Sequence, residues 1–355
     1  MDLLDQITKL SHEFGSSAYV RGGGGNTSVK ENSTLWVKPS GTTLADLTSS
    51  DFLAMDRSTL GRLYDVTPPD DASAREALVK EMMEQAVLPQ TPGRASVEAP
   101  LHNSLAARYV VHTHPALVNG MTCGKHGKSA CEEYFPQSLW VDYVDPGYTL
   151  CMEVRKAIKQ YEKEFGREPS LIFLKNHGVF VSADDPDEIR ELYARVLTTL
   201  ERHYENHGVG RELGIGPEPD VADVAAAKEK VRRAFGDPDV CVVASGPIVL
   251  PEGPVSPDHI VYAKSYYMTV EPTVEEVQAF TAKHGYLPHI VAFGPVVLGI
   301  GPTQKKAELA MELATDAAWV KQLAEAFGGI DYMSDDARAF IENWEVESYR
   351  SQQVK

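Results

Sequence analysis

The first two hundred residues alternate between apolar runs with helical spacing and shorter, strand-like runs. The helical spacing predicts helices over residues 2–14, 72–87, 99–107 and 150–165, and one from the acidic segment 184–188 to about residue 204. The shorter runs predict strands over residues 27–31, 34–38, 109–114, 171–174 and 179–182. Proline and acidic residues at 184–188 are typical of a helix start.

Glycine and proline accumulate near residues 207–220, which is typical of a linker. We therefore expect two domains, residues 1–209 and 210–355. The second part predicts helices over residues 221–235, 273–284, 303–327 and 335–348. Its predicted strands cover residues 239–244, 259–263, 267–271, 289–293 and 295–300. The overall pattern is that of an α/β or α+β protein.

Composition narrows the classes of partner. The 355 residues are 43% hydrophobic, enough for a sizeable core, and the formal net charge is −17, from 51 acidic and 34 basic residues. Without a basic cluster we expect neither nucleic acid nor an anionic membrane as partner. No apolar run is long enough for a membrane span, and the first residues do not resemble a signal peptide. Four cysteines without a Cys-x-x-Cys motif fit a reducing, cytoplasmic setting.

Histidines carry the strongest chemical signal. His112 and His114 are two residues apart in a predicted strand, so both side chains face the same side. Pro115 ends that strand and leaves the pair at an edge. His177 lies in a predicted turn between strands, where Gly178 permits an unusual backbone angle. Because a catalytic Zn²⁺ needs three protein ligands and one open position, these three histidines predict a zinc site; core or surface histidines are the alternative.

Glu98 precedes the segment that leads to the histidine pair. A carboxylate close to Zn²⁺ can act as a fourth ligand or as a proton shuttle. It can equally be an ordinary acidic residue at a helix start, because Pro100 follows in what would be the first turn. His102, four residues further on, either supports the site or faces the core of its short helix.

A glycine-rich loop offers donors for an anion. Residues 21–28 read Arg-Gly-Gly-Gly-Gly-Asn-Thr-Ser, and their backbone N–H groups and polar side chains suit a phosphate or carboxylate. The alternative is a flexible turn before a strand. Thr27 replaces the third glycine of a dinucleotide-binding fingerprint, so that interpretation is rejected. A second loop, residues 38–43, supplies further donors and one lysine.

These motifs together resemble the class II aldolase/adducin family. The matching stretches are Gly24-Gly25-Asn26-Thr27-Ser28, Lys38-Pro39-Ser40-Gly41, Glu98 with Pro100 and His102, His112-Thr113-His114-Pro115, and Lys175-Asn176-His177-Gly178. They follow the family's order and cover about residues 1–207.

The resemblance implies a three-layer α/β fold, with a central, mostly antiparallel sheet flanked by helices. The pattern of the second part adds a smaller α/β C-terminal domain. The resemblance also implies a homotetramer with active sites between subunits, and one Zn²⁺ per subunit on His112, His114 and His177, with Mn²⁺ or Co²⁺ as alternatives. Glu98 would move the proton, and five residues would hold a substrate phosphate: Gly25, Asn26, Ser40, Gly41 and Ser96.

The activity that the resemblance implies is cleavage of a ketose 1-phosphate, of rhamnulose or fuculose type, to dihydroxyacetone phosphate and a small aldehyde. A 4-epimerase, a sugar-acid phosphate decarboxylase and a non-catalytic adducin-like module are the alternatives. The family's aldolases usually carry two serines before the glutamate, whereas this chain has Ser96-Val97. An acid or tyrosine from beyond the histidine pair is also expected, and Glu132, Glu133 and Tyr134 lie in that region.

The second part resembles the aldolase half of bacterial rhamnulose-phosphate aldolase/dehydrogenase fusions, in residues 256–262 and 343–350. Because this chain stops before the dehydrogenase region of those fusions, we expect no NAD site.

Overall fold

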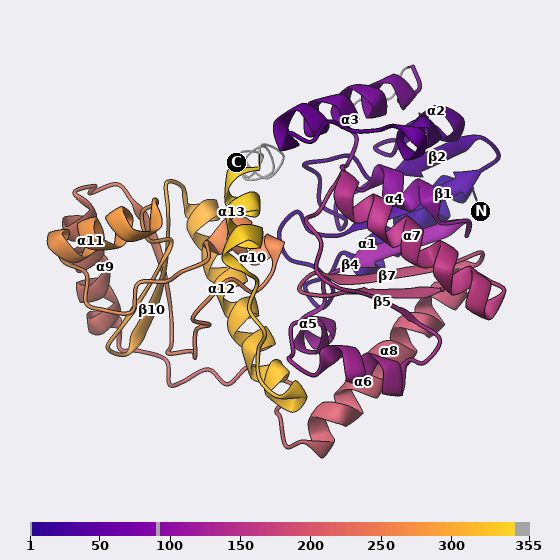
Figure 1. Cartoon of the computed structure of the whole chain (residues 1–355). Helices are drawn as coiled ribbons and strands as arrows, with labels where there is room; N and C mark the ends of the chain where they lie inside the picture. The colour runs from indigo at the N-terminus through magenta and orange to yellow at the C-terminus, as the bar shows by residue number, and fades with distance from the viewer. Residues whose placement is uncertain (1, 90–92, 345–355) are drawn as a thin grey trace. The chain divides into compact units, whose positions relative to one another are not determined.

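The computed structural model describes residues 2–89 and 93–344 and divides the chain into two compact units. The first unit comprises residues 1–118 and 127–200, and the second comprises residues 119–126 and 201–355. The boundary expected near residue 210 stays a prediction. Each unit contains one sheet covered by helices (Figure 1).

The first unit is built on a seven-stranded sheet in the order β3-β2-β1-β4-β7-β6-β5. Its strands are β1 (Asn26–Glu31), β2 (Thr34–Val37), β3 (Leu53–Asp56), β4 (Tyr109–Thr113), β5 (Leu139–Val141), β6 (Leu171–Leu174) and β7 (Gly178–Ala183). Only the β5–β6 pair is parallel, so the expected mostly antiparallel sheet is confirmed. The short strands β3 and β5 were not predicted.

Helices cover both faces of this sheet. They are α1 (Leu3–Phe14), α2 (Arg57–Gly61), α3 (Ala72–Ala86), α4 (Ala99–Ser104), α5 (Ala116–Thr122), α6 (Gly127–Tyr134), α7 (Tyr148–Phe165) and α8 (Pro186–Asn206), with a 3-10 turn at Arg62–Asp65. The sequence pattern missed α2, α5 and α6. Both α5 and α8 continue into residues of the second unit.

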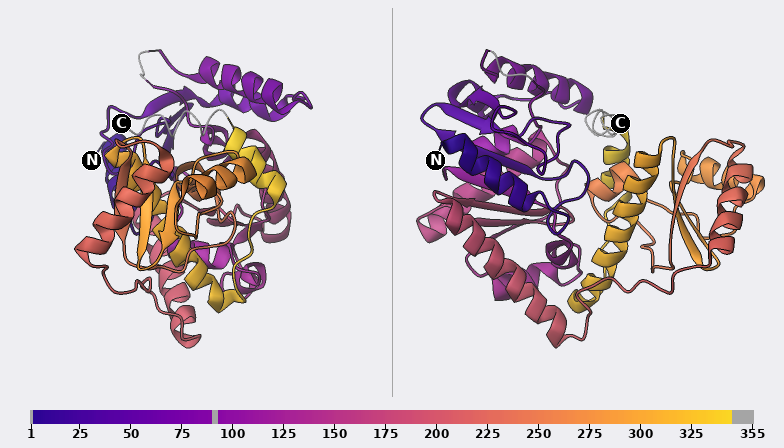
Figure 2. Two further views of the ribbon diagram at one scale, coloured as in Figure 1. Left: turned by 90° about the vertical axis from the view of Figure 1, so that its left-hand side faces the viewer. Right: turned by 180° about the vertical axis from the view of Figure 1, so that it is seen from behind.

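Alternation along the strands divides the first unit into layers. The Thr113 hydroxyl on β4 lies 2.7 Å from the Tyr193 hydroxyl on α8, which places α8 on the odd-numbered face of β4. Val110, on the opposite face, belongs to one core cluster with Leu101 of α4 and Val154 of α7. The expected three-layer architecture is thus confirmed, and Figure 2 shows it from two further sides.

The second unit contains the three-stranded antiparallel sheet β8-β10-β9. Its elements are β8 (Cys241–Ser245), β9 (Ile290–Phe293), β10 (Val296–Gly301), α9 (Val221–Phe235), α10 (Pro257–Ala263), α11 (Val274–His284), α12 (Gln304–Ala324), a 3-10 turn (Glu325–Phe327) and α13 (Asp335–Asn343). Val231 of α9 and Val277 of α11 pack with the sheet in one cluster. Met311 of α12 lies against Gly299 of β10. An α/β C-terminal unit is therefore present.

Two predicted strands of the second unit are wrong. Residues 259–263 lie in helix α10, which begins after Ser256 with Pro257 in its first turn, and all seven of its residues are buried. In a continuous apolar run the polar residues do not recur at a fixed spacing. Hydrophobic periodicity therefore cannot distinguish a buried helix from a strand there. Residues 267–271 form no strand, and Met268 makes one isolated bridge to Val291. Helix α13 ends at Asn343, and the remainder predicted to residue 348 lies largely outside the described residues.

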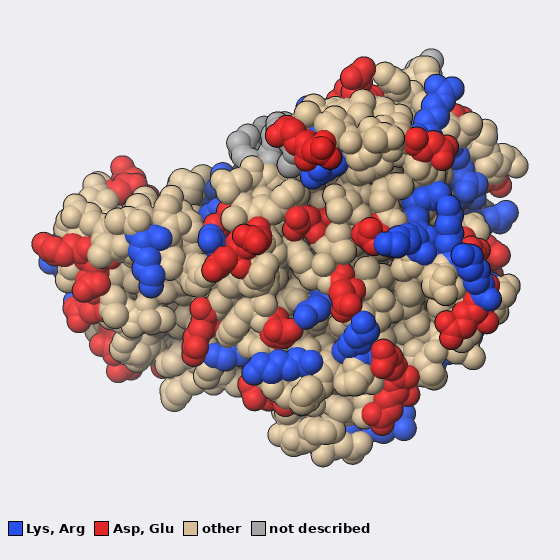
Figure 3. All heavy atoms as spheres, in the orientation of Figure 1, with Lys and Arg blue, Asp and Glu red and all other residues tan. Residues whose placement is uncertain are grey.

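The surface carries side chains of both charges (Figure 3). On the face in Figure 3, acidic and basic side chains are intermixed, apart from one basic group at the edge of the first unit. Within residues 2–89 and 93–344, no helix combines the length and hydropathy needed to cross a bilayer.

Candidate metal centre

The register of three neighbouring strands creates the centre. Asn26 of β1 lies directly opposite His112 of β4, and His112 lies opposite Phe180 of β7. These three side chains form one row across the sheet on the face that carries α4 and α7. The row lies at the start of β1 and near the end of β4, at one edge of the strands where loops adjoin the sheet. Side chains from loops can therefore reach it.

The structure brings the three predicted histidines together. Their candidate ligand nitrogens all lie within 4.8 Å of one another. The ring centroids are separated by 4.6 Å between His112 and His114, 5.0 Å between His112 and His177, and 4.9 Å between His114 and His177. His112 is completely buried, His177 is 7% exposed, and His114 is half-buried. The cluster is thus buried on one side and accessible on the side of His114.

His112 is fixed in the tautomer that a metal ligand requires. Its Nδ1 lies 3.0 Å from the Val179 carbonyl oxygen, which can only accept, so Nδ1 carries the proton and donates it. Its ring stacks on Phe180 at 3.8 Å between centroids. The lone pair of Nε2 then points at the cluster, 2.9 Å from His114 Nε2. This backbone partner is the support that metal-binding imidazoles usually have, so the donor set fits a cation such as Zn²⁺.

The turn between β6 and β7 delivers the third imidazole. His177 N–H donates to the Leu174 carbonyl at 3.2 Å, and Asn176 adopts a left-handed backbone with φ 52°. Gly178 then passes so close to β4 that a Cβ would lie 2.4 Å from the Thr113 carbonyl oxygen. Only glycine allows this approach. The turn therefore holds His177 beside His112.

Glu98 lies next to the cluster. Its Oε1 is 3.2 Å from His112 Nε2 and 3.8 Å from His177 Nε2, and its side chain is 13% exposed. Burial raises the pKa of Glu98, but the attraction of His112, His177 and His102 lowers it by more. The pKa of Glu98 therefore lies well below its ordinary range. Glu98 occupies the N-cap position of α4 without capping the helix through its side chain. Its orientation toward the histidines favours the chemical interpretation over that of a helix-start acid.

Asn26 connects the glycine-rich loop with Glu98. Its Nδ2 donates to Glu98 Oε2 at 2.8 Å and to Ser96 Oγ at 2.9 Å, while its Oδ1 is buried without a partner among the described residues. Gly25 has φ 73°, and a Cβ there would lie 2.9 Å from the His112 carbonyl oxygen. The glycine is thus required where the loop crosses β4. Gly25, Asn26 and Ser96 consequently lie around one point beside the cluster.

The second loop approaches the same end of the sheet. Lys38 N–H donates to the Thr27 carbonyl at 3.0 Å, and Ser40 N–H donates to the Arg94 carbonyl at 2.9 Å. Arg94 lies two residues before Ser96. Gly41 is exposed and has φ 84°. Ser40 and Gly41 therefore adjoin the segment that carries Ser96, and their role in binding phosphate stays a prediction.

His102 lies behind Glu98 on α4. It is completely buried, and its Nδ1 lies 2.8 Å from Ser28 Oγ on β1. Among the described residues its Nε2 has no hydrogen-bond partner, and burial lowers the pKa of His102 to about 3. His102 is thus neutral and ties α4 to the strand that carries Asn26.

Two contacts of the centre were not predicted from the sequence. The stacking of Phe180 and the carbonyl of Val179 depend on strand register, and the only sequence signal for them is that both follow Gly178 in a predicted strand. Helix α6 carries Glu132, Glu133 and Tyr134. Burial and Glu133 raise the pKa of Tyr134. A catalytic role for these three residues stays a prediction.

The sheet and the histidine cluster define a three-layer protein with a candidate metal centre at one end of its sheet. The chain belongs to the class II aldolase and adducin family, because the family model "Class II Aldolase and Adducin N-terminal domain" matches residues 5–204. This confirms the resemblance seen in the sequence motifs.

Individual relatives cover different parts of the chain. An "Uncharacterized oxidoreductase YuxG" of Bacillus subtilis is 22% identical over 98% of this chain, and the chain spans 58% of that relative's length. An "L-fuculose phosphate aldolase" of Methanocaldococcus jannaschii is 24% identical over 51% of this chain and 83% of its own. The longer relative fits the expected likeness to an aldolase fused to an oxidoreductase.

Solved structures with a similar first part include the N-terminal class II aldolase domain of a conserved protein from Thermoplasma acidophilum. It has a TM-score of 0.48 and 23% identity, and the match covers 57% of this chain and 93% of the other. The L-fuculose-1-phosphate aldolase of Thermus thermophilus has a TM-score of 0.40 and 17% identity. The match covers 59% of this chain and 98% of the other.

Proposed function

We propose that this chain is a Zn²⁺-dependent aldolase that cleaves a ketose 1-phosphate to dihydroxyacetone phosphate and a small aldehyde. The observation that carries the proposal is the convergence of three imidazoles within 4.8 Å, with Glu98 Oε1 3.2 Å from one of them. Three imidazoles with a carboxylate beside them form a donor set that leaves room for substrate oxygens. The family membership and the printed names of two relatives support a sugar phosphate as substrate.

His112, His114 and His177 would hold the cation. When bound, it supplies Lewis acidity for the carbonyl oxygen and the neighbouring hydroxyl of the substrate. Imidazole ligation favours Zn²⁺ but separates it only weakly from Mn²⁺ and Co²⁺.

Glu98 would move the proton at C3 of the substrate. In cleavage the C4 hydroxyl gives its proton to the acid or tyrosine proposed from the neighbouring subunit, which acts here as a base; the C3–C4 bond breaks toward C3, and C4 becomes the aldehyde. C3 then takes a proton, which Glu98 delivers; in the reverse, condensing direction its carboxylate removes that proton. The lowered pKa of Glu98 suits the condensing direction, because this direction starts from the carboxylate.

Asn26 would orient both Glu98 and the substrate. Its Nδ2 donates one hydrogen to Glu98 Oε2, at 2.8 Å between nitrogen and oxygen, and the other to Ser96 Oγ at 2.9 Å. A phosphate placed beside Ser96 would take donors from Gly25, Asn26, Ser40, Gly41 and Ser96, with Asn26 giving it the N–H that otherwise reaches Ser96. These donors compensate for a net charge of −17, which by itself repels an anionic substrate.

Assembly as a homotetramer with sites between subunits is part of the proposal, as is an acid or tyrosine from a neighbouring subunit. Tyr134 is the candidate for that tyrosine. We propose residues 1–209 as the catalytic domain and residues 210–355 as a C-terminal domain.

The deciding experiment incubates the Zn²⁺-loaded full-length chain with L-rhamnulose 1-phosphate, L-fuculose 1-phosphate and L-ribulose 5-phosphate, and identifies the products by mass spectrometry. The expected result is dihydroxyacetone phosphate with lactaldehyde from either 1-phosphate. An isomer of equal mass would instead show an epimerase. Release of CO₂ from sugar-acid phosphates in a parallel assay would show a decarboxylase. Metal binding without turnover of any substrate would indicate the non-catalytic, adducin-like class.

A further inference from the structure

A pocket of about 890 Å³ lies within the second unit, away from all residues of the candidate metal centre along the chain. Five separate segments converge on it: the loop after β8, the extended stretch at residues 266–269, the end of α11, strand β9 and helix α13. Its polar lining comprises Glu252, Tyr266, Tyr267, Thr269, Lys283, His284 and Arg338, so two cations face one carboxylate. Cavities of this volume with a few convergent polar groups are typical of small-molecule sites.

An aromatic surface forms one wall. The rings of Tyr266 and His284 lie 4.6 Å apart with 31° between their planes, and His284 lies 4.6 Å from Phe280. Tyr266 N–H donates to the Tyr286 hydroxyl at 3.0 Å, which fixes the backbone of this wall. The flat face of Tyr266 suits a ring-shaped ligand group.

Arg338 is held in place at the same wall. Its Nη1 donates to Glu342 at 2.5 Å, its Nε donates to Asp335 at 3.3 Å, and its guanidinium lies 5.7 Å from the Tyr266 ring centroid. Glu342 in turn accepts from Ser265 Oγ at 2.8 Å. A guanidinium oriented by two carboxylates keeps its remaining N–H donors in a fixed direction.

Lys283 adds a second cation. It is exposed, and within residues 2–89 and 93–344 no ion pair involves it. Burial lowers the pKa of His284, and Lys283 and Arg338 lower it further, against a smaller opposite effect of Glu342. Basic residues such as Lys283 and His284 are favourable in the last turn of a helix, because they interact with its dipole. This effect explains their place on α11 but not the presence of Arg338 and the tyrosines beside them.

We propose that this pocket binds a phosphorylated small molecule that carries a sugar ring, such as a sugar phosphate or a nucleotide. Lys283 and Arg338 donate to the phosphate, Tyr266 packs on the ring, and the Tyr267 and Thr269 hydroxyls bond to ring hydroxyls. The proposal does not depend on the aldolase activity proposed for the first unit.

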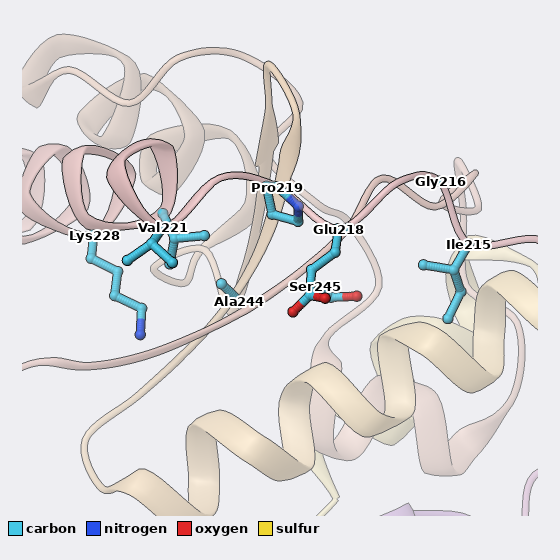
Figure 4. Close-up of a pocket in the computed structure, with 10 residues that line it drawn as sticks. Ile215, Gly216, Glu218, Pro219, Val221, Lys228, Ala244 and Ser245 are labelled. Carbon is cyan, nitrogen blue, oxygen red and sulfur yellow. The ribbon is translucent and has the colours of Figure 1, made fainter.

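A second hollow of about 590 Å³ in this unit lacks these features (Figure 4). It lies between the segment before α9 and the end of β8. Its lining includes the exposed apolar side chains of Ile215 and Val221, with Lys228 and Glu218 as opposite charges. It offers an anion no excess of cations.

The test follows His284 by NMR in the full-length chain labelled with ¹³C-histidine, where loss of one signal in His284→Gln assigns the reporter. The probes are adenosine 5′-monophosphate, ribose 5-phosphate and inorganic phosphate. We expect both organic phosphates to shift the His284 signal saturably and to bind more tightly than inorganic phosphate. A difference between the two shows whether a base contributes.

The variant Lys283→Gln should weaken both organic phosphates roughly tenfold, because it removes one charge-assisted hydrogen bond. Its matched control is Lys305→Gln, which changes an exposed lysine of the same unit outside the pocket and should bind as the unchanged chain does. His112→Ala should also leave this binding unchanged, which separates the pocket from the proposed active site. The proposal is overturned if the His284 signal does not move, if inorganic phosphate binds as tightly as the organic phosphates, or if Lys283→Gln binds normally.

Discussion

Asn26 and His112 lie directly opposite each other on the neighbouring strands β1 and β4. This register places the donor of the glycine-rich loop next to the most buried imidazole of the cluster. Glu98 joins both, because its Oε2 accepts from Asn26 at 2.8 Å and its Oε1 lies 3.2 Å from His112. The glycine-rich loop and the candidate metal centre are therefore one structure.

Asn26→Asp should impair the proposed reaction severely. Aspartate has the shape of asparagine, but it replaces the N–H donor that lies 2.8 Å from Glu98 Oε2 by a carboxylate oxygen. This oxygen is negatively charged at neutral pH and can only accept. We expect kcat/KM to fall about 100-fold, as for the loss of a charge-assisted hydrogen bond and the addition of a like charge. Steady-state kinetics with the phosphorylated substrate measures this. Asn32→Asp, at an exposed turn, is the control, and equal kinetics in the two variants would contradict the role of Asn26.

His112→Ala and His177→Ala should each remove the bound metal. Loss of one of three imidazoles leaves two ligands, and His112 also carries the stacking on Phe180. Metal content by mass spectrometry after dialysis should approach zero in both variants and stay at one per chain in His207→Ala, where an exposed histidine outside the cluster is changed. Stoichiometric metal in His177→Ala would place the site elsewhere.

Glu98→Gln should separate metal binding from turnover. Glutamine preserves the volume and one acceptor but cannot transfer the proton, so kcat should drop roughly 100-fold or more while metal content is kept. Glu84→Gln, at an exposed position of α3, is the matched control. A kcat unchanged in Glu98→Gln would remove this residue from the mechanism.

Gly25→Ala should destabilise the fold and damage the centre. The left-handed backbone costs about 1–2 kcal/mol for alanine. The added methyl group also meets Val20 at 2.7 Å and the His112 carbonyl at 2.9 Å, which adds about 1–3 kcal/mol. Gly166→Ala shares a positive φ, 70°, but its methyl group meets nothing within 4 Å, so it should show only the first cost. Urea unfolding of both variants measures the difference, and equal losses would refute the steric argument.

Lys30 should make stability depend on pH. Its Nζ donates to the Ala107 carbonyl at 2.7 Å, the side chain is 4% exposed, and burial lowers its pKa to about 7. In the unfolded chain Lys30 keeps its proton up to about pH 10.4. Between about pH 7 and that value the unfolded state therefore binds more protons than the folded state. The free energy of unfolding should therefore rise with pH above 7, by at most about 1.4 kcal/mol per pH unit from this group. Denaturation between pH 7 and 9 should show a smaller slope in Lys30→Met, and identical slopes would count against a buried, titrating lysine.

Local patterns were sufficient to predict the histidine cluster. Two-residue periodicity placed His112 and His114 on one face, and Pro115 indicated the strand end. A turn signal at Asn176-His177-Gly178 indicated the third imidazole. These features depend on a few adjacent residues, so a single sequence displays them.

What the sequence did not show depends on distant segments. The contact of Val179 with His112 requires the β4–β7 register, and no local pattern specifies which strands become neighbours. Helix α10 was predicted as a strand because it is buried on every side, so its apolar run has no polar face. The serine and proline at its start, Ser256 and Pro257, are a helix signal that outweighs the apolar run.

The donors of the centre come from β4, from the β6–β7 turn and from the start of α4, segments that span residues 98–177 of the chain. No short stretch contains a complete ligand set, so a peptide spanning residues 109–116 would capture the ion weakly. We therefore expect the proposed ion to bind tightly only after the strands have paired. Metallation would then follow folding, in contrast to small zinc modules whose chain collapses around the ion.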